Sequence, residues 1–325
     1  MAGFGWVRLG SARFRWVRLG WDQLGSARFG SVRLVSVGVD RGDWFGGRSA
    51  FGWWRAPEWR YRRQVPTDDL LVSVSDGVLR LTINRPERRN AMSWDVVRGL
   101  REAVAGARTD DDVRVVVVTG AGDEAFCSGA DLGGMGDETE GFLALHDARG
   151  ELANVFRAMW DLGKPTVARV PGWAMAGGFG LALACDLVVA SDRARFGAPE
   201  IKVGLWPFMV TVPMLRSMGT KAALDLMLTG RVVAAEEALR LGFVSRVVPH
   251  DDLDATVDDL AATLASRSPA VMRLGRDAFY AVVDMPADPA LAHLHAMLTL
   301  VNQTEDAAEG IAAFTDKRAP QWRGR

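Results

Sequence analysis

The sequence of 325 residues is poor in cysteine and histidine, with two cysteines, Cys127 and Cys185, and four histidines. Two cysteines cannot build the disulfide framework of a small secreted domain, so we expect a reducing compartment and a cytoplasmic location. The histidines are scattered, and neither the C-x-x-C nor the H-E-x-x-H spacing of zinc ligands occurs. The sequence therefore predicts no bound metal ion.

Long apolar runs are also missing. No stretch approaches the roughly 20 apolar residues that cross a bilayer as a helix, so we expect no integral membrane protein. Hydrophobic residues nevertheless make up 49% of the chain, and the formal net charge is only -1. This composition predicts a soluble protein with enough apolar material for one large domain or two modest ones.

The small net charge conceals an uneven distribution. Residues 1–64 hold 12 arginines, 4 acidic residues and no lysine, which leaves this segment at +8 and the remainder at -9. The segment is rich in Trp and Gly, and residues 6–14 recur in part at 16–20 and 25–30. It shows no sustained strand or helix period.

Three interpretations compete for residues 1–64. A basic, aromatic segment can contact nucleic acid or a membrane surface. An Arg-rich segment with few acids can also be an organelle transit peptide, although the Gly and Trp content fits that poorly. We favour the third interpretation, a disordered or spuriously translated extension, and expect neither nucleic acid nor a membrane as a partner.

The pattern changes near Asp68. Two β-rich runs at residues 70–74 and 78–83 flank a Ser-Asp-Gly turn and predict a hairpin, and Ser93 is placed to cap a helix reaching about residue 107. The next expected elements are a buried strand at 113–118, a Gly-rich loop at 120–136, a helix at about 140–162, a strand at 165–170, a helix from Gly177 to near Cys185 and a strand at 186–190. The later pattern is mostly helical, at 208–217, 219–228, 234–241, 251–267, 269–284, 288–302 and 304–316.

This alternation of strands and helices predicts an α/β fold with parallel strands and a helical C-terminal portion. We place the core at residues 65–265, and the C-terminal helical region of the same domain at residues 266–325. No Ser/Pro/Gly linker divides the two.

The stretch from Gly172 to Asp186, GWAMAGGFGLALACD, places small residues where an apolar helix begins. The first N–H groups of a helix have no acceptor within the helix and lie at the positive end of its dipole. Small residues let a ligand approach those groups, so the turn can hold a developing oxyanion. Glu200, in the segment Ala198-Pro-Glu-Ile201, would supply an acid or base beside it.

Several motifs in order resemble the crotonase superfamily of enoyl-CoA hydratases and isomerases, over about residues 68–325. They are Asn84-Arg-Pro-Glu-Arg-Arg-Asn-Ala-Met92, Gly120-Ala-Gly-Asp-Glu-Ala-Phe-Cys-Ser-Gly-Ala-Asp-Leu132, Lys164-Pro-Thr-Val-Ala168 leading into residues 172–186, the Pro-Glu-Ile segment, Leu228-Thr-Gly230 with residues 235–242, and residues 304–310 ahead of Lys317-Arg318. The resemblance implies a crotonase-like ββα superhelix whose C-terminal helices complete the site and build a homotrimer or a dimer of trimers. It implies an acyl-CoA thioester as substrate and no separate cofactor, since CoA enters as part of the substrate.

By the same resemblance, the backbone N–H groups of Ala130 and Gly177 form the oxyanion hole for the thioester oxygen. The alternative is that these small residues only permit tight turns and close packing. The other residues that the resemblance implies for binding the substrate and its CoA portion are Arg85, Asn90, Ala91, Ser128, Gly129, Asp131, Leu132, Gly178, Trp206, Phe314 and Lys317. Of these, Trp206 can equally be core, and Lys317 can be a solvated helix end.

One position departs from the hydratase pattern. Typical hydratases of the family carry two glutamates; here the second is present as Glu200, whereas the first aligns with Gly180. A single carboxylate can move a proton from C2 to C4 of a 3-enoyl thioester, as the isomerases of the family do. We therefore favour double-bond isomerisation, or related thioester-enolate chemistry, with Glu200 as the acid–base group.

Two alternatives stay open for the function. One is a 2-enoyl-CoA hydratase that works with Glu200 alone, and the other is an acyl-CoA-binding homologue without catalysis. Two features of the sequence could replace the missing carboxylate, His146 and the acidic loop at residues 137–140. We expect His146 to be an ordinary helix residue and the acids to form a solvated helix start.

Overall fold

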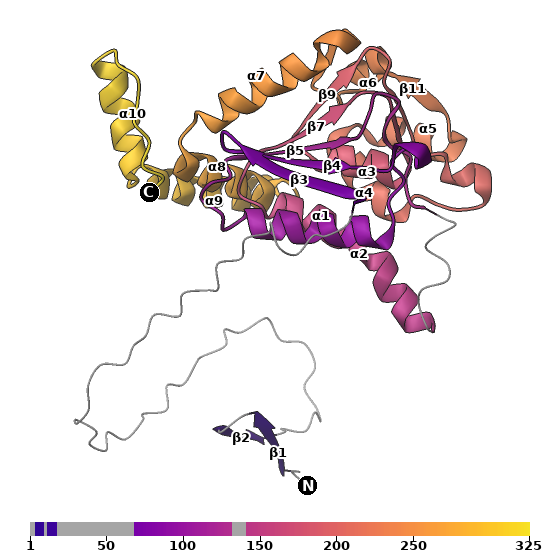
Figure 1. Cartoon of the computed structure of the whole chain (residues 1–325). Helices are drawn as coiled ribbons and strands as arrows, with labels where there is room; N and C mark the ends of the chain where they lie inside the picture. Colours follow the sequence, from indigo (N-terminus) through magenta and orange to yellow (C-terminus); the bar gives the residue numbers. More distant parts are fainter. Residues whose placement is uncertain (1–3, 10–11, 18–67, 132–140) are drawn as a thin grey trace. The chain divides into compact units, whose positions relative to one another are not determined.

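The computed structural model describes residues 4–9, 12–17, 68–131 and 141–325 (Figure 1). The chain divides into two units, residues 1–54 and residues 55–325. In the first unit, strands β1 (Phe4–Leu9) and β2 (Ala12–Val17) pair antiparallel, although the sequence showed no sustained period there. Both strands are rich in Val, Phe and Trp, which favour strands, and a short repeat can pair with itself. The remaining residues of the segment 1–64 lie outside the described residues.

A six-stranded sheet forms the centre of the second unit, in the order β12-β9-β7-β5-β4-β3. β3 and β4 form the predicted antiparallel hairpin, and the other neighbours pair in parallel. The strands are β3 (Leu70–Ser75), β4 (Val78–Ile83), β5 (Val115–Gly120), β7 (Thr166–Val170), β9 (Leu187–Ser191) and β12 (Arg246–Val248).

Beside it lies a second sheet that the sequence did not predict, in the order β11-β10-β8-β6. Its strands have three residues each: β6 (Ala125–Cys127), β8 (Trp173–Met175), β10 (Arg195–Gly197) and β11 (Val232–Ala234). β6, β8 and β10 run parallel, so their C-terminal ends open on the same edge. The predicted catalytic segments follow these three strands directly.

The helices agree closely with the predicted ranges. They are α1 (Trp94–Ala107), α2 (Phe142–Trp160), α3 (Gly177–Ala184), α4 (Phe208–Ser217), α5 (Thr220–Thr229), α6 (Ala235–Leu241), α7 (Leu253–Ala265), α8 (Pro269–Val282), α9 (Ala287–Val301) and α10 (Glu305–Thr315). The short 3-10 turns are η2 (Pro86–Arg88), η3 (Pro199–Val203) and η4 (His250–Asp252). Ser93, Ser268 and Thr304 cap α1, α8 and α10 by accepting a backbone N–H in the first turn.

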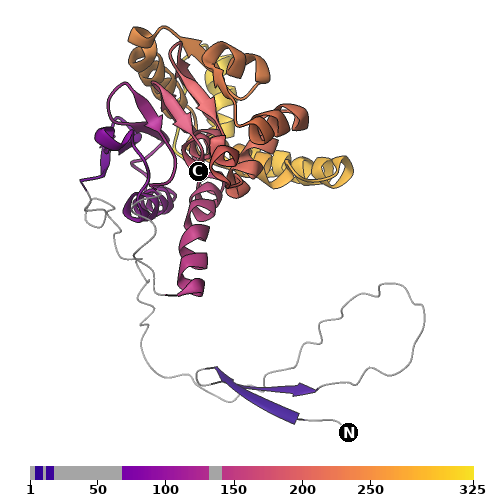
Figure 2. The ribbon, with the colours of Figure 1, turned by 90° about the vertical axis from the view of Figure 1, so that its right-hand side faces the viewer.

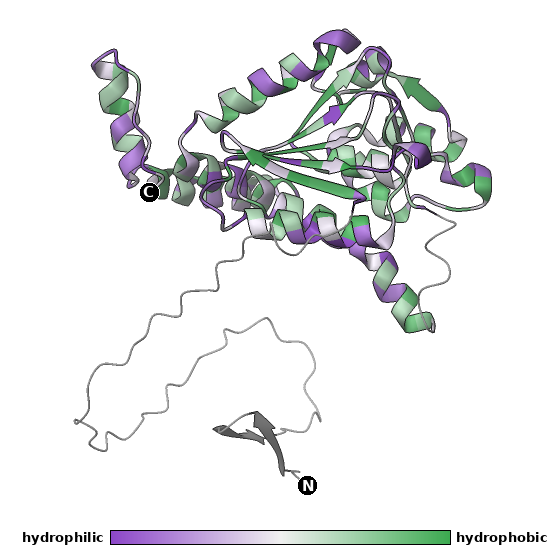
Figure 3. Cartoon of the chain, in the orientation of Figure 1, coloured by the Kyte–Doolittle hydropathy of each residue, from purple (hydrophilic) through white to green (hydrophobic). Residues whose placement is uncertain are grey.

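Helices cover both faces of the large sheet at its centre, which explains why the central strand β5 is a continuous apolar run (Figures 1 and 3). All six residues of β5 are buried. Val115 and Val117 join a cluster with residues of α7, whereas Val116 and Val118 join the main core that includes α1, α2 and α3. The expected fold class, an α/β crotonase-like superhelix with a C-terminal helical region, is confirmed by the solved structures reported below.

A partly buried ion pair fastens α8 to the C-terminal end of α3. Asp186, just beyond α3, accepts hydrogen bonds from Arg276 Nε (2.8 Å) and from the Tyr280 hydroxyl (2.6 Å). Arg276 also donates to the carbonyls of Met159 (2.6 Å) and Trp160 (2.9 Å) at the end of α2. One arginine on α8 therefore holds the C-terminal ends of both α2 and α3.

Helices α9 and α10 extend from the body, and α10 lies at the far side of the sheet from α3 (Figures 1 and 2). Within the ranges that the structure describes, no helix is long and apolar enough to cross a membrane. Among the same residues, His, Cys, Asp and Glu side chains nowhere gather into a group that could hold a metal ion.

The turn that leads into α3 contains a strained residue. Ala176 has φ 50° and ψ -126°, a conformation that glycine adopts easily and that an L side chain rarely adopts. Such strain costs on the order of 1–3 kcal/mol and persists only where the surrounding structure enforces it. Here the Ala176 N–H bonds to the Gly197 carbonyl (2.9 Å), which locks the turn to β10.

We expect Ala176→Gly to raise the free energy of unfolding by about 1 kcal/mol, because glycine relieves the strain while gaining some freedom in the unfolded chain. Urea denaturation measures this. Ala174→Gly is the matched control, since Ala174 is fully buried in β8 without a positive φ and should lose stability. Equal losses in both variants would show that the Ala176 turn stores no strain.

Candidate active site

The structure brings Ala130 and Gly177, the two predicted oxyanion donors, next to each other. A Cβ built on Gly177 would lie 3.9 Å from the Ala130 backbone nitrogen. The two turns also touch at their preceding residues, since a Cβ on Gly129 would lie 2.9 Å from the Ala176 methyl group. This contact requires glycine at position 129, whose φ is 108°.

The Ala130 amide is left free by the way its loop is held. Ala130 forms an isolated parallel bridge with Met92, in which the Met92 N–H donates to the Gly129 carbonyl (2.8 Å) and the Asp131 N–H donates to the Met92 carbonyl (2.9 Å). These two bonds fix the residues on either side of Ala130. The Ala130 N–H itself has no acceptor among the described residues.

Gly177 is the first residue of α3, so its N–H has no acceptor within the helix. Met92 Cε and Leu152 Cδ2 both lie 3.2 Å from the position of a Cβ on Gly177, and they form an apolar wall there. Two unpaired amides beside hydrocarbon can stabilise a developing oxyanion strongly, since little water competes for them. The sequence did not identify Met92 or Leu152 as part of this wall.

Glu200 lies on η3, directly after β10. The Ala176 N–H bonds to the carbonyl of Gly197, the last residue of β10. Since η3 begins two residues after Gly197, it starts close to the turn that carries Gly177. The Glu200 side chain is half-buried, and its Oε2 is buried without a hydrogen-bond partner among the described residues. Burial raises the pKa of this carboxyl above its ordinary 4.5, and a hydrogen bond from its own backbone N–H partly offsets that rise.

The position of the missing glutamate is filled with hydrocarbon. A Cβ on Gly180 would meet Phe156 Cζ at 2.9 Å and Val210 Cγ2 at 3.1 Å. Phe156 and Val210, from α2 and α4, are both buried. No side chain larger than that of glycine fits at position 180 unless these neighbours move.

The predicted CoA-binding residues gather around Arg85. Its guanidinium pairs with Asp131 (2.9 Å) and Asp69 (3.1 Å) and donates to the Ala91 carbonyl (2.7 Å). The Ser128 hydroxyl donates to the Arg88 carbonyl (3.3 Å). These contacts order the loop before Ala130, while Leu132 lies outside the described residues.

Asn90 does not fit the predicted binding role. It is 1% exposed; its Nδ2 donates to the carbonyls of Ala121 (3.0 Å) and Ala125 (2.7 Å), and its Oδ1 accepts the Arg85 N–H (3.0 Å). A side chain so enclosed braces the loop and has no surface for a ligand. Gly178 is similarly enclosed, because a Cβ there would lie 2.3 Å from the Cys127 carbonyl oxygen.

The remaining candidates make no contact with the paired amides among the interactions of the described residues. Trp206 is half-buried and packs against the main core. Phe314 on α10 is 88% exposed, and Lys317 follows the same helix, on the far side of the sheet from α3 (Figure 1). His146 is exposed on the first half of α2, and the acidic loop at 137–140 lies outside the described residues.

Known proteins resemble this chain over most of the second unit. The model of the family Enoyl-CoA hydratase/isomerase matches residues 73–325. The (E)-benzylidenesuccinyl-CoA hydratase of Thauera aromatica is 37% identical over 78% of this chain and 98% of its own length. The 2,3-dehydroadipyl-CoA hydratase of Escherichia coli is 37% identical over 79% of this chain and 99% of its own length.

Solved structures give the same result. The enoyl-CoA hydratase of Mycobacterium smegmatis superimposes with a TM-score of 0.74 at 33% identity, over 78% of this chain and 98% of that structure. An enoyl-CoA hydratase from Bacillus anthracis gives 0.75 at 29% identity, over 79% and 100%. With its free paired amides, its half-buried glutamate and these relatives, the chain belongs to the enoyl-CoA hydratase/isomerase family of enzymes.

Proposed function

We propose that the protein hydrates 2-enoyl-CoA thioesters, with Glu200 as its single acid–base group. The observation that carries the proposal is the pair of free amides at Ala130 and Gly177, with a half-buried carboxyl on the neighbouring segment. The relatives reported above are named hydratases, which favours hydration over the isomerisation that the sequence led us to expect.

In this mechanism the thioester oxygen accepts hydrogen bonds from the Ala130 and Gly177 amides. Ionised Glu200 takes a proton from a water molecule as the water oxygen bonds to C3, and the C2=C3 electron pair moves toward the thioester to form an enolate. Glu200 then returns that proton to C2, so H and OH are added and the carboxylate is regenerated. Each amide contributes about 3–4 kcal/mol to stabilising the enolate-like transition state.

One feature favours isomerisation as a second candidate. The space beside Gly180 holds Phe156 and Val210, where a two-glutamate hydratase has its other carboxylate. A single glutamate can remove a proton from C2 of a 3-enoyl thioester and return it to C4, which moves the double bond to C2=C3. The same two amides would hold the dienolate, so hydration and isomerisation must be distinguished by assaying both reactions.

We further propose a homotrimer or a dimer of trimers, in which α10 of one copy reaches the site of another. Phe314 and Ile311 are 88% and 67% exposed, and between α8 and α10 lies a largely apolar cavity of about 960 Å³. Such exposed apolar surface is typical of interfaces. We also propose a cytoplasmic location, which suits the free, buried Cys127 and Cys185.

Glu200→Gln should lower kcat about 10²–10⁴-fold, because the amide cannot accept the proton from water, while KM changes little. Crotonyl-CoA hydration and 3-enoyl-CoA isomerisation are measured side by side. Glu237→Gln is the control, since Glu237 is also half-buried but its carboxylate is paired with Arg231 (2.8 Å). Tight acyl-CoA binding without turnover in the wild type would instead support a non-catalytic homologue.

The activity should fall on the acid side of its pH profile at a pH above the ordinary glutamate pKa of 4.5. Glu200 must be ionised to act as the base, and burial raises the pKa at which it loses its proton. The pH dependence of kcat/KM reports this group in the free enzyme. An acid limb at or below the ordinary value would mean that Glu200 is solvated rather than half-buried.

Gly180→Glu should not raise the hydration rate, although it restores the second glutamate of the family pattern. The new side chain would collide with Phe156 and Val210, and such overpacking typically costs about 1–3 kcal/mol of stability. Gly150→Glu is the matched control, since a Cβ on Gly150 of α2 meets nothing within 4 Å. A faster, equally stable Gly180→Glu enzyme would show that the hydrocarbon wall yields easily.

A further inference from the structure

Helix α2 lies along the side of α3 that carries the predicted donors. Leu152 Cδ2 lies 3.2 Å from the Cβ position of Gly177, and one turn later Phe156 Cζ lies 2.9 Å from that of Gly180. A step of one turn along α2 therefore matches a step of one turn along α3. An acyl chain that starts at the Gly177 amide and follows the seam between α2 and α3 passes Leu152 first and meets Phe156 next.

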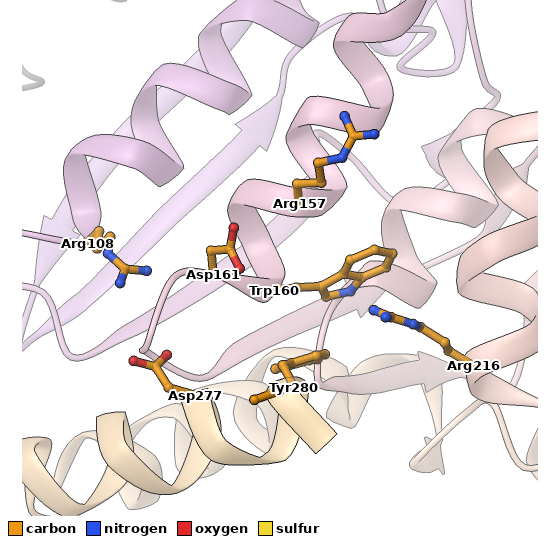
Figure 4. A pocket seen from close by; sticks show the side chains of 8 residues that line it. Arg108, Arg157, Trp160, Asp161, Arg216, Asp277 and Tyr280 are labelled. Atoms are coloured by element: carbon orange, nitrogen blue, oxygen red, sulfur yellow. The ribbon is translucent and has the colours of Figure 1, made fainter. Parts of the chain in front are cut away.

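A cavity lies one further turn along α2, beyond Phe156 (Figure 4). The Phe156 and Trp160 rings are 6.3 Å apart, and Trp160 is part of the lining of this cavity of about 550 Å³. Polar and aromatic side chains from four helical segments surround it: Arg108, Arg157, Trp160, Asp161, Arg216, Asp277 and Tyr280. From Leu152 to Trp160 the helix rises about 12 Å.

Phe156 and Val210 fill the space beside Gly180. Phe156 is 2% exposed and Val210 is 3% exposed. Met214, one turn after Val210 on α4, is fully buried as well. Within the described residues, the seam along α3 therefore ends at the Phe156 ring.

Trp160, by contrast, is held on both sides. The Arg216 guanidinium lies 4.2 Å from the Trp160 ring centroid, and the Tyr280 ring stacks on Trp160 at 6.4 Å with an interplanar angle of 24° (Figure 4). Tyr280 is in turn fixed by its hydrogen bond to Asp186. Trp160 is thus braced, and on α2 the Phe156 ring lies next to both the Trp160 ring and the space beside Gly180 of α3.

We propose that Phe156 sets the upper length of the acyl chain by separating the reaction site from the cavity beyond it. With the ring in place the protein prefers short 2-enoyl-CoA substrates. With the ring removed, a longer chain extends along α2 and reaches the cavity, where the aliphatic stems of the arginines and the Trp160 edge contact its end. This inference rests on the proposed function, because it assumes that the thioester lies at the Ala130 and Gly177 amides.

The test compares crotonyl-CoA with 2-decenoyl-CoA in the wild type, Phe156→Ala and Phe156→Leu. We expect the ratio of kcat/KM for 2-decenoyl-CoA to that for crotonyl-CoA to rise at least about tenfold in Phe156→Ala, and less in Phe156→Leu, since leucine leaves a smaller opening. Phe179→Leu is the matched control: its ring on α3 is equally buried but packs against Phe196 and Phe243, so the ratio should stay at the wild-type value. Circular dichroism and thermal melting show which variants are folded, and Phe156→Leu carries the test if Phe156→Ala does not fold.

Calorimetric binding of butyryl-CoA and decanoyl-CoA gives a second readout that needs no turnover. Phe156→Leu should improve the affinity for decanoyl-CoA relative to butyryl-CoA. A folded Phe156→Leu protein with wild-type ratios in both assays overturns the role of Phe156, even if the wild type hydrates crotonyl-CoA. If no variant hydrates any thioester while the binding ratio still shifts, the proposed reaction fails and the length limit stands.

Discussion

The contact between two turns, Gly129-Ala130 and Ala176-Gly177, is the constraint on which the candidate site depends. A Cβ on Gly129 would lie 2.9 Å from the Ala176 methyl group, so the turns approach as closely as their atoms allow. Two sets of backbone hydrogen bonds impose this approach: Met92 bonds to the residues on either side of Ala130, and the Gly197 carbonyl at the end of β10 fixes Ala176. The amides converge because β6 and β8 run parallel, so that the turns after them lie at the same edge of the second sheet. The strain at Ala176 is a consequence of that geometry.

The glycine at position 180 determines how many carboxyl groups the site has for proton transfer. In a site with two carboxyls, one can activate water while the other supplies a proton. Here hydrocarbon from α2 and α4 replaces one of them, which leaves proton transfer to Glu200. Burial of the Glu200 carboxyl raises its pKa and favours its neutral form. The site therefore combines the absence of one acid with a raised pKa of the other.

The sequence predicted the helices and five of the six strands of the large sheet, and it missed the three-residue strand β12 at the edge. Ser93 marked the start of α1, and the continuous apolar run in β5 marked a strand buried on both faces. The second sheet was missed because strands of three residues, such as β8 and β10, are too short to show a period. Local patterns also could not show that Asn90 turns inward or that Phe156 faces Gly180, since both depend on packing between distant segments.

The ion pair behind α3 has a consequence for how the chain folds. Asp186 finds its arginine 90 residues later in the sequence. Until α8 has been synthesised, Asp186 is tied to Thr166 of β7, whose N–H donates to the Asp186 carboxylate (2.8 Å) and whose hydroxyl accepts the Asp186 N–H (2.8 Å). A chain emerging from the ribosome can therefore form its strands and fasten the end of α3 to β7 before Arg276 joins the ends of α2 and α3. Premature termination before Arg276 would leave Asp186 without its cationic partner and would remove the guanidinium that links these two helix ends.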